Sequence, residues 1–311
     1  MTTIDKKKSE IWTIGGGKGG IGKSFIISSI GNYLAQKGKS VVLVDADLGG
    51  ANLHTFLGVN KPKNSLTDFF DKKIPISEII TDTEIPNMRL LIGAVRSFAP
   101  SNIKYTQKLK FFRHIAKINA DYILIDVGAG AHFNTIDTFL IADKMIVLIV
   151  PEIISVENMY FFLKNVFLRK LMHSMNDHGL KDIFISTWKN REKYNIKNLY
   201  QFISYLKDLS NPIENIVDKE LSNFMVYILL NQVRSNQEIM IGNSVKSICM
   251  KYFGLNSQYI GYVEYDDFIT RCVNKRQPYM EAYPASRCAK EIERLTENLI
   301  KGGHINIKIL L

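Results

Sequence analysis

The sequence predicts an α/β fold with a doubly wound, mainly parallel sheet that is flanked by helices and carries a helical insertion. Two observations support this class. Short, continuously apolar runs alternate with longer amphipathic stretches, and such runs are typical of parallel strands because helices cover both faces of the sheet. A glycine-rich loop also separates the first apolar run from the first helical stretch.

These patterns place the individual elements. Apolar runs predict strands, and an apolar residue every three to four positions predicts a helix. The predicted strands are residues 11–15, 41–45, 89–92, 122–126, 145–150, 225–230 and 258–261. The predicted helices are residues 23–36, 104–117, 156–175, 238–253 and 286–301.

We expect one domain over residues 11–301, preceded by a polar tail (1–10) and followed by a short tail (302–311). Residues 178–223 differ in texture, because they are polar, rich in Asn and Lys, and interspersed with aromatic side chains. We expect this segment to be an insertion of one or two short helices between two strands, packed against the domain. A separate partner-binding module is the alternative.

The 311 residues carry a formal net charge of +10, and 46% of them are hydrophobic. That hydrophobic fraction is typical of a globular protein and excludes a largely disordered chain. The positive charge leaves contact with nonspecific DNA or with an anionic membrane open. No dense basic run occurs, so a solvated, lysine-rich surface is the simpler interpretation.

Cysteine spacing and apolar runs bear on location. Cys249, Cys272 and Cys288 lie far apart, which excludes a disulfide framework and a Cys-x-x-Cys metal knuckle. The first ten residues are polar, and the longest apolar run, residues 145–150, is too short to cross a bilayer. We therefore expect a cytoplasmic protein, at most peripheral at the inner face of the cell membrane.

The strongest motif is G-x-x-x-x-G-K-[ST], between the first predicted strand and helix. Its members are Gly17, Lys18, Gly19, Gly20, Ile21, Gly22, Lys23 and Ser24. Glycines let successive backbone N–H groups face a phosphate, and the helix N-terminus adds partial positive charge. Lys23 is expected to contact the β- and γ-phosphates and the Ser24 hydroxyl to bind Mg²⁺. The motif predicts a P-loop NTPase.

Two carboxylates complete the predicted metal site. Asp45 follows the run VVLV and Asp126 follows YILI. A buried carboxylate is costly unless a cation or a donor meets it, and Mg²⁺ beside Ser24 provides one. Asp126 has the Walker B form, and Gly128 follows it in a loop expected to turn an amide towards the γ-phosphate. We therefore predict Ser24, Asp45 and Asp126 as metal ligands.

Lys18 is not required by an ordinary phosphate loop. The run GKGGIGKS, followed by VVLVDADLGGANLHTFLG, resembles the deviant Walker A loop and first switch of the MinD/ParA ATPases. The resemblance implies that Lys18 reaches the nucleotide of a second subunit and that Asp47 positions or activates the attacking water. We therefore predict Lys18, Lys23 and Asp47 as catalytic residues. Asn52 matches the family's polar switch position, with capping or turn formation as the alternative for Asp47 and Asn52.

Weaker matches extend the resemblance over about residues 11–299, outside the insertion. Pro151-Glu152 resembles a turn near the dimer interface, and Asn231 matches a position that hydrogen-bonds adenine in relatives. The resemblance implies further nucleotide contacts at Phe25, Asn52, Gly128, Glu152, Asn231 and Val263. ATP rather than GTP is implied in the same way.

The resemblance implies a slow, Mg²⁺-dependent ATPase that forms a nucleotide-dependent homodimer and is stimulated by a protein partner. The sequence looks most like the MinD-like branch that includes FlhG, so we expect spatial regulation of flagella, the division site or another cargo. The alternatives are a P-loop ligase or synthetase, an iron–sulfur carrier-type ATPase and a DNA-binding segregation ATPase.

Two segments bear on membrane contact. The tail 302–311 alternates more like a strand than like an amphipathic helix. The predicted helix 156–175 has an apolar stripe at helical spacing, for which core packing is the expected role and a partner or membrane surface the alternative. The stripe consists of Phe161, Phe162, Val166, Phe167, Leu171, Met172 and Met175.

Overall fold

The computed structural model describes residues 8–47, 50, 52–60, 64–93 and 105–302. Of the predicted tails, 1–7 and 303–311 therefore lie outside the described residues. Glu10 already belongs to the first strand, and Gly302 follows the last helix.

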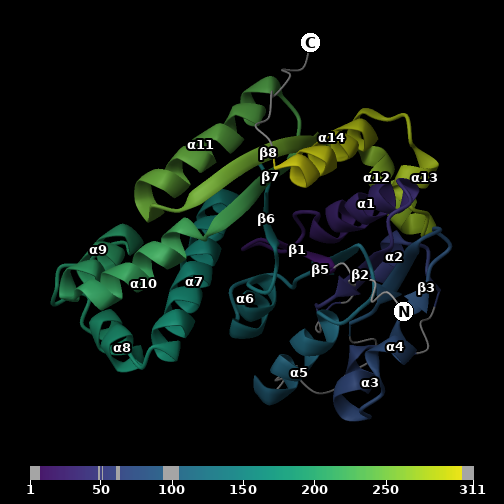
Figure 1. Cartoon of the computed structure of the whole chain (residues 1–311). Coiled ribbons are helices and arrows are strands. Elements are labelled where there is room, and N and C mark those ends of the chain that lie inside the picture. The colour runs from purple at the N-terminus through teal and green to yellow at the C-terminus, as the bar shows by residue number, and fades with distance from the viewer. Residues whose placement is uncertain (1–7, 48–49, 51, 61–63, 94–104, 303–311) are drawn as a thin grey trace.

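Eight strands form one sheet in the order β3-β4-β2-β5-β1-β6-β7-β8 (Figure 1). All neighbours pair in parallel except β3 and β4. The predicted class, an α/β fold with a mainly parallel sheet flanked by helices, is confirmed. The strands are β1 (Glu10–Gly15), β2 (Val41–Asp45), β3 (Thr81–Asp82), β4 (Met88–Leu91), β5 (Tyr122–Asp126), β6 (Lys144–Ile149), β7 (Met225–Val233) and β8 (Asn256–Glu264).

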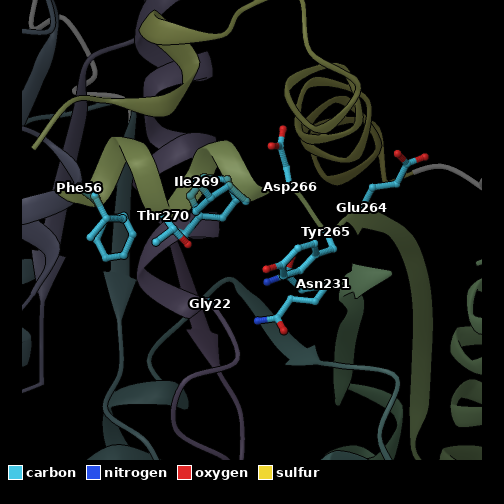
Figure 2. A pocket seen from close by; sticks show the side chains of 11 residues that line it. Gly22, Phe56, Asn231, Glu264, Tyr265, Asp266, Ile269 and Thr270 are labelled. Carbon is cyan, nitrogen blue, oxygen red and sulfur yellow. The ribbon is translucent and has the colours of Figure 1, made fainter. Parts of the chain in front are cut away.

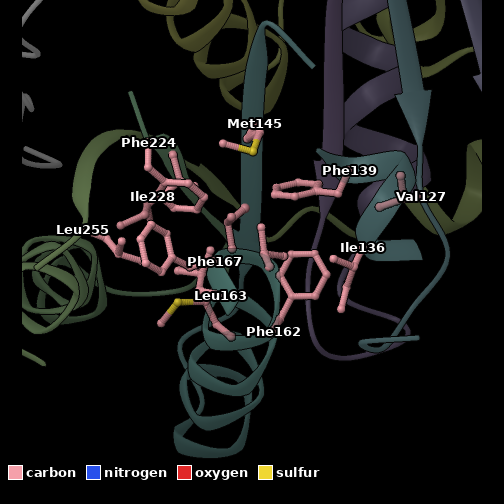
Figure 3. Packing of buried hydrophobic residues seen from close by; sticks show 14 of the residues in the cluster. Val127, Ile136, Phe139, Met145, Phe162, Leu163, Phe167, Phe224, Ile228 and Leu255 are labelled. Atoms are coloured by element: carbon pink, nitrogen blue, oxygen red, sulfur yellow. The ribbon is translucent and has the colours of Figure 1, made fainter. Parts of the chain in front are cut away.

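Helices cover both faces of the sheet, and β2 shows how. Val41 and Leu43 pack into the core beneath α1 and α14, whereas Val42 and Val44 pack into the opposite core, part of which Figure 3 shows. Every residue of β2 is buried, as expected of a strand covered on both sides. The helices are α1 (Lys23–Gln36), α2 (Leu53–Phe56), α3 (Leu66–Asp71), α4 (Ile76–Ile79), α5 (Tyr105–Ile115), α6 (Phe133–Phe139), α7 (Ile153–Asp177), α8 (Lys181–Lys189), α9 (Leu199–Leu209), α10 (Asn211–Ser222), α11 (Asn236–Phe253), α12 (Asp267–Lys275), α13 (Tyr279–Ala282) and α14 (Arg287–Lys301).

The order in which the chain adds strands to the sheet changes side at β1. After β1 the chain builds the side of the sheet that contains β2, β4 and β5, and then crosses to β6, β7 and β8 on the other side. Ligands of open α/β sheets bind beyond the carboxyl ends of the strands at such a switch point. The glycine-rich loop leaves β1 at this place.

The segment between β6 and β7 differs in detail from the prediction. It contains α8, α9 and α10 after the long helix α7, three helices where one or two were expected (Figure 1). Their apolar faces are short and are interrupted by polar residues, so the sequence pattern does not separate the three helices. Helix α9, for example, buries Leu199, Phe202, Ile203 and Leu206. These residues belong to the same buried cluster as strands β6 and β7.

The apolar stripe of α7 is mainly core, as expected. Phe162, Val166, Phe167, Leu171 and Met175 are buried, whereas the Phe161 side chain is 57% exposed. Across the described part of the chain, no helix has both the length and the apolarity that a membrane crossing needs.

A buried charge cluster joins α5, α6 and α7. The Asp137 carboxylate accepts hydrogen bonds from Arg169 Nε (2.7 Å) and Nη2 (2.9 Å) and from the Lys108 ammonium group, and His173 Nε2 lies 3.5 Å away. Burial by itself would raise the pKa of Asp137, but hydrogen bonds from His173, Arg169 and Lys108 outweigh it and hold the pKa well below its usual range.

We expect Asp137→Asn to lower the free energy of unfolding by about 3 kcal/mol, because it removes the buried carboxylate charge that pairs with both Lys108 and Arg169. Since the folded-state pKa is depressed, this stabilisation is complete above the unfolded pKa of about 4 and is lost as pH falls through the folded value. Urea unfolding at pH 7 measures the effect. Glu192→Gln, which removes the exposed partner of Arg191 at 3.7 Å, is the control; equal stability of both variants would contradict the assignment.

Candidate functional site

The loop between β1 and α1 uses its glycines for two reasons. Gly20 and Gly22 have φ angles of 76° and 95°, a left-handed conformation that favours glycine. A Cβ atom at Gly22 would also lie 2.3 Å from Asn231 Nδ2. Gly22 is the N-cap of α1, so the backbone amides at the start of this helix face the cavity beside it, as phosphate binding requires.

Gly17 has a different role, which the motif did not predict. A Cβ atom at this position would lie 2.1 Å from the backbone oxygen of Asn158 in α7. The loop therefore packs directly against the first turns of α7. Gly15 and Gly16, which precede Gly17, indicate in the sequence that the backbone here passes close to other residues. The sequence does not indicate that α7 is the element in contact.

Lys23 begins α1 and is buried, with Nζ 3.5 Å from the backbone oxygen of Lys18. Burial lowers the pKa of Lys23, and the nearby carboxylates of Asp126 and Asp47 oppose that shift. The Ser24 hydroxyl donates a hydrogen bond to Asp126 Oδ2 at 2.5 Å. The Lys23 ammonium group, the Ser24 hydroxyl and the Asp126 carboxylate thus lie together at the start of α1.

Asp45 and Asp126 lie side by side, because the register of β2 and β5 pairs them. Burial, together with the Asp126 charge, raises the pKa of Asp45 to about 7, although the N–H groups of Leu53 and Asp47 donate to its carboxylate at 3.0 and 3.1 Å. Burial raises the pKa of Asp126 to about 6. Two adjacent buried carboxylates repel each other unless a cation lies between or beside them.

The predicted metal ligands fit Mg²⁺. Asp126 Oδ1 is buried and accepts no hydrogen bond from any described residue, and with Ser24 and Asp45 it forms a set of oxygen donors, which Mg²⁺ prefers. Among the described residues, no group of three or more His, Cys, Asp or Glu side chains is arranged to hold a metal ion. Mg²⁺ sites of this kind use one or two carboxylates of the protein, and phosphate oxygens and water complete the ligand set.

A cavity of about 300 Å³ brings most of the predicted residues together. Gly128 does not line it but lies beside Asp47, which does, since a Cβ atom at Gly128 would lie 3.4 Å from Asp47 Cγ. Asn52 is the N-cap of α2, but its side chain makes no capping hydrogen bond, so capping does not explain it. The cavity is lined by Gly19, Gly20, Gly22, Lys23, Ser24, Asp45, Asp47, Gly50, Asn52, Phe56, Asp126, Val127 and Ala129.

A second cavity of about 220 Å³ adjoins the first. Figure 2 shows Asn231 and Tyr265 at one end and Phe56 at the other. Asn231 Nδ2 donates to the Ile21 backbone oxygen at 2.8 Å, and its Oδ1 atom is buried and accepts no hydrogen bond from the part of the chain that the structure describes. The cavity is lined by Gly22, Phe25, Phe56, Asn231, Gln232, Glu264, Tyr265, Asp266, Ile269, Thr270 and Val273.

Six predicted nucleotide contacts line neither cavity: Gly17, Lys18, Ile21, Gly128, Glu152 and Val263. Val263 is fully buried and packs in the core beneath α1 and α14, while the residues after it line the second cavity; in a strand, alternate side chains face opposite sides. Lys18 and Glu152 form an ion pair with each other, with Lys18 Nζ 2.6 Å from Glu152 Oε2. Phe56 was not predicted, because an apolar residue in a short switch helix carries no chemical signal.

The parallel sheet, the glycine-rich loop at its switch point and the paired carboxylates define a P-loop NTPase. Comparisons with known proteins agree. The model of a family described as "AAA domain" matches residues 9–180, more than half of the chain. The septum site-determining protein MinD of Helicobacter pylori is 34% identical over 148 residues, which is 47% of this chain and 54% of that protein. The chain thus spans about half the length of that relative.

Two further proteins align with nearly the whole chain. The antiactivator FleN of Pseudomonas aeruginosa is 20% identical over 292 residues, 93% of this chain and 86% of FleN. The structure of MinD from Pyrococcus horikoshii, solved with Mg-ADP, has a TM-score of 0.62 at 19% identity and covers 94% of this chain and 96% of that one. The chain belongs to the MinD/ParA family of P-loop ATPases.

Proposed function

We propose that this chain is a Mg²⁺-dependent ATP-binding and ATP-hydrolysing dimerisation switch of the MinD/ParA type, acting in spatial regulation. The observation that carries the proposal is the phosphate cavity, where Lys23, Ser24, Asp47 and the pair Asp45/Asp126 converge, with Lys18 in the same loop. Residues 11–301 act as one P-loop domain in this proposal.

Each residue of the cavity has a role that follows from its position. Ser24, Asp126 and Asp45 would hold Mg²⁺, which when bound neutralises charge on the phosphate oxygens. Lys23 neutralises the β- and γ-phosphates, and Asp47 orients the attacking water. The amide of Gly128, beside Asp47, meets the γ-phosphate. Phosphoryl transfer depends mostly on positioning and charge neutralisation, so these groups form a nearly complete set.

Asn231 favours adenine over guanine. One of its two Nδ2 hydrogens is donated to the Ile21 carbonyl, and its buried Oδ1 atom accepts no hydrogen bond from the described residues, so Oδ1 is an acceptor available to a ligand. An exocyclic amino group, as adenine has, can donate to it, whereas the carbonyl at the same position of guanine cannot. ATP is therefore the proposed substrate.

The homodimer is proposed to use Lys18. In the single chain, Lys18 pairs with Glu152 of the same chain, and both side chains are more than one-third exposed (36% and 55%). An ion pair exposed to this degree contributes at most about 1 kcal/mol, so a partner's phosphates can replace Glu152 at little cost. Lys18 would then reach the nucleotide of a second copy.

The process and the partners belong to the same proposal. FleN and MinD relatives make flagellar regulation and division-site placement the leading roles, with stimulation by an activating protein. The protein would be cytoplasmic, with peripheral membrane contact and nonspecific DNA binding as further partners to test. Of the tail 302–311, one of the two segments considered for membrane contact, residues 303–311 lie outside the described residues.

The alternatives are less well supported. A ligase or synthetase is not favoured by the relatives, which are MinD and FleN proteins. An iron–sulfur carrier needs accessible thiolates, but Cys249, Cys272 and Cys288 are buried. Burial raises the pKa of Cys249 to about 11 and that of Cys288 to about 12, which keeps these thiols protonated.

Light scattering after size-exclusion chromatography tests the switch. We expect dimers with ATP and Mg²⁺ and monomers with ADP. Lys18→Ala is expected to bind ATP yet stay monomeric, because it lacks the cation that reaches the second nucleotide. Lys39→Ala removes an exposed lysine and serves as the control. A wild-type chain that stays monomeric with saturating ATP, or a Lys18→Ala variant that dimerises normally, would contradict the proposal.

A further inference from the structure

The two cavities of the nucleotide site share two lining residues, Gly22 and Phe56. A ligand with phosphates in the first cavity and a base in the second must therefore pass between the Gly22 backbone and the Phe56 ring. The base-binding side chains lie on the far side of the second cavity, where Figure 2 shows Asn231 and Tyr265 opposite Phe56. The sugar of a nucleotide is the part that lies between its phosphates and its base.

The local fold explains why Phe56 is available for this contact. Its neighbours in the chain fix helix α2 to the core, because Leu53 and Leu57 are 0% and 2% exposed. The Leu53 N–H group also donates to Asp45 Oδ2 at 3.0 Å. Phe56, in contrast, is only partly buried. Helix α2 thus places the Phe56 ring at the passage between the cavities. The other end of α2 is held by its hydrogen bond to Asp45, a carboxylate of the proposed metal site.

The opposite wall of the passage cannot substitute for this contact. Gly22 has no side chain, and a Cβ atom there would collide with Asn231 Nδ2 at 2.3 Å. Among the described residues, the Phe56 ring is therefore the only side-chain surface common to both cavities. An aromatic ring provides a large apolar surface at low entropic cost and packs well on a sugar or base.

We propose that Phe56 is a positioning residue that packs against the nucleoside and makes the site select a nucleotide over a ligand made of phosphates alone. The inference rests on the proposed nucleotide binding and adds that α2 contacts the nucleoside with Phe56 while it holds Asp45 through its first N–H group. Phe56 also lines the first cavity, but a phosphate-only ligand has no sugar or base that could pack against its ring.

The test compares two ligands that differ only in the nucleoside. Calorimetric titrations with MgADP and with magnesium pyrophosphate are performed on the full chain, on Phe56→Ala and on Phe56→Leu. ADP is used to keep dimerisation out of the measurement. We expect Phe56→Ala to raise the Kd for MgADP about tenfold and to change the Kd for magnesium pyrophosphate less than twofold. Phe56→Leu, which keeps an apolar surface, is expected to restore part of the loss.

Phe161→Ala is the matched control, since Phe161 is 57% exposed on α7 and lines neither cavity; it is expected to bind both ligands normally. Unchanged MgADP binding by Phe56→Ala would overturn the inference. Equal weakening for both ligands would also overturn it, because Phe56 would then support only the loop. A wild-type chain that binds pyrophosphate and ADP equally well refutes the selectivity, whereas one that binds neither refutes the proposed function itself.

Discussion

Asp47→Ala is expected to lower the rate of ATP hydrolysis at least a hundredfold while leaving ATP binding nearly intact. Asp47 lines the phosphate cavity but belongs neither to the loop that faces the phosphates nor to the carboxylate pair at Ser24. Removing a group that orients or activates the nucleophile typically costs two to four orders of magnitude in rate. ATP binding depends on Lys23 and the loop amides, so the substitution lowers the rate of hydrolysis without a comparable loss of affinity.

The same substitution should change the lifetime of the dimer. If hydrolysis reopens the dimer, a chain that binds ATP without cleaving it accumulates as a dimer, and this is the state expected for Asp47→Ala in light scattering. Phosphate release, measured at saturating ATP and Mg²⁺, reports the rate. Hydrolysis at the wild-type rate, or a variant that remains monomeric with saturating ATP, would contradict the role of Asp47.

Lys23→Ala is expected to weaken ATP binding about a hundredfold. Lys23 is buried at the floor of the phosphate cavity, where a charge-assisted hydrogen bond to a phosphate is worth about 3 kcal/mol, or roughly two orders of magnitude in Kd. Its loss also leaves Asp126 without the nearby positive charge that offsets its burial. Calorimetric titration with MgATP measures the change, and Lys39→Ala controls for the loss of one positive charge. Equal affinities of the two variants would show that Lys23 does not contact the phosphates.

The motif residues could be predicted because their chemistry is local in the sequence. The G-x-x-x-x-G-K-[ST] spacing fixes the order strand, loop and helix, and the structure begins α1 at Lys23 as predicted. Asp45 and Asp126 were recognisable as carboxylates that end apolar strands. That they are adjacent follows from the parallel register of β2 and β5, which the sequence suggests only through the fold class.

Other features depend on contacts between distant segments, and no local pattern encodes these. The approach of Gly17 to Asn158 and the pairing of Lys18 with Glu152 each join the loop to α7. Phe56 lines both cavities because of where α2 packs. Strand β3 is only two residues long, too short to produce a pattern. Strand β8 extends beyond its predicted bounds at both ends, because polar residues begin it and Gly261 interrupts its apolar run.

The ion pair between Lys18 and Glu152 connects the phosphate-binding loop to the start of α7. Glu152 immediately precedes α7, and the loop that carries Lys18 packs on the same helix through Gly17. Release of Lys18 towards a second subunit would therefore change the contacts at the start of α7. This helix leads directly into α8 to α10, so the inserted helices lie beside the element that is expected to respond to dimerisation.

In the proposed function, a nucleoside triphosphate is bound by the amides at the start of α1, by Lys23 and by a Mg²⁺ ion held beside Ser24. Titrating the wild-type chain with ATP in a calorimeter, once with Mg²⁺ and once with excess chelator, tests it most directly. We expect one ATP per chain, with affinity at least tenfold weaker when Mg²⁺ is removed. No measurable heat with either buffer, or the same affinity in both, would contradict it.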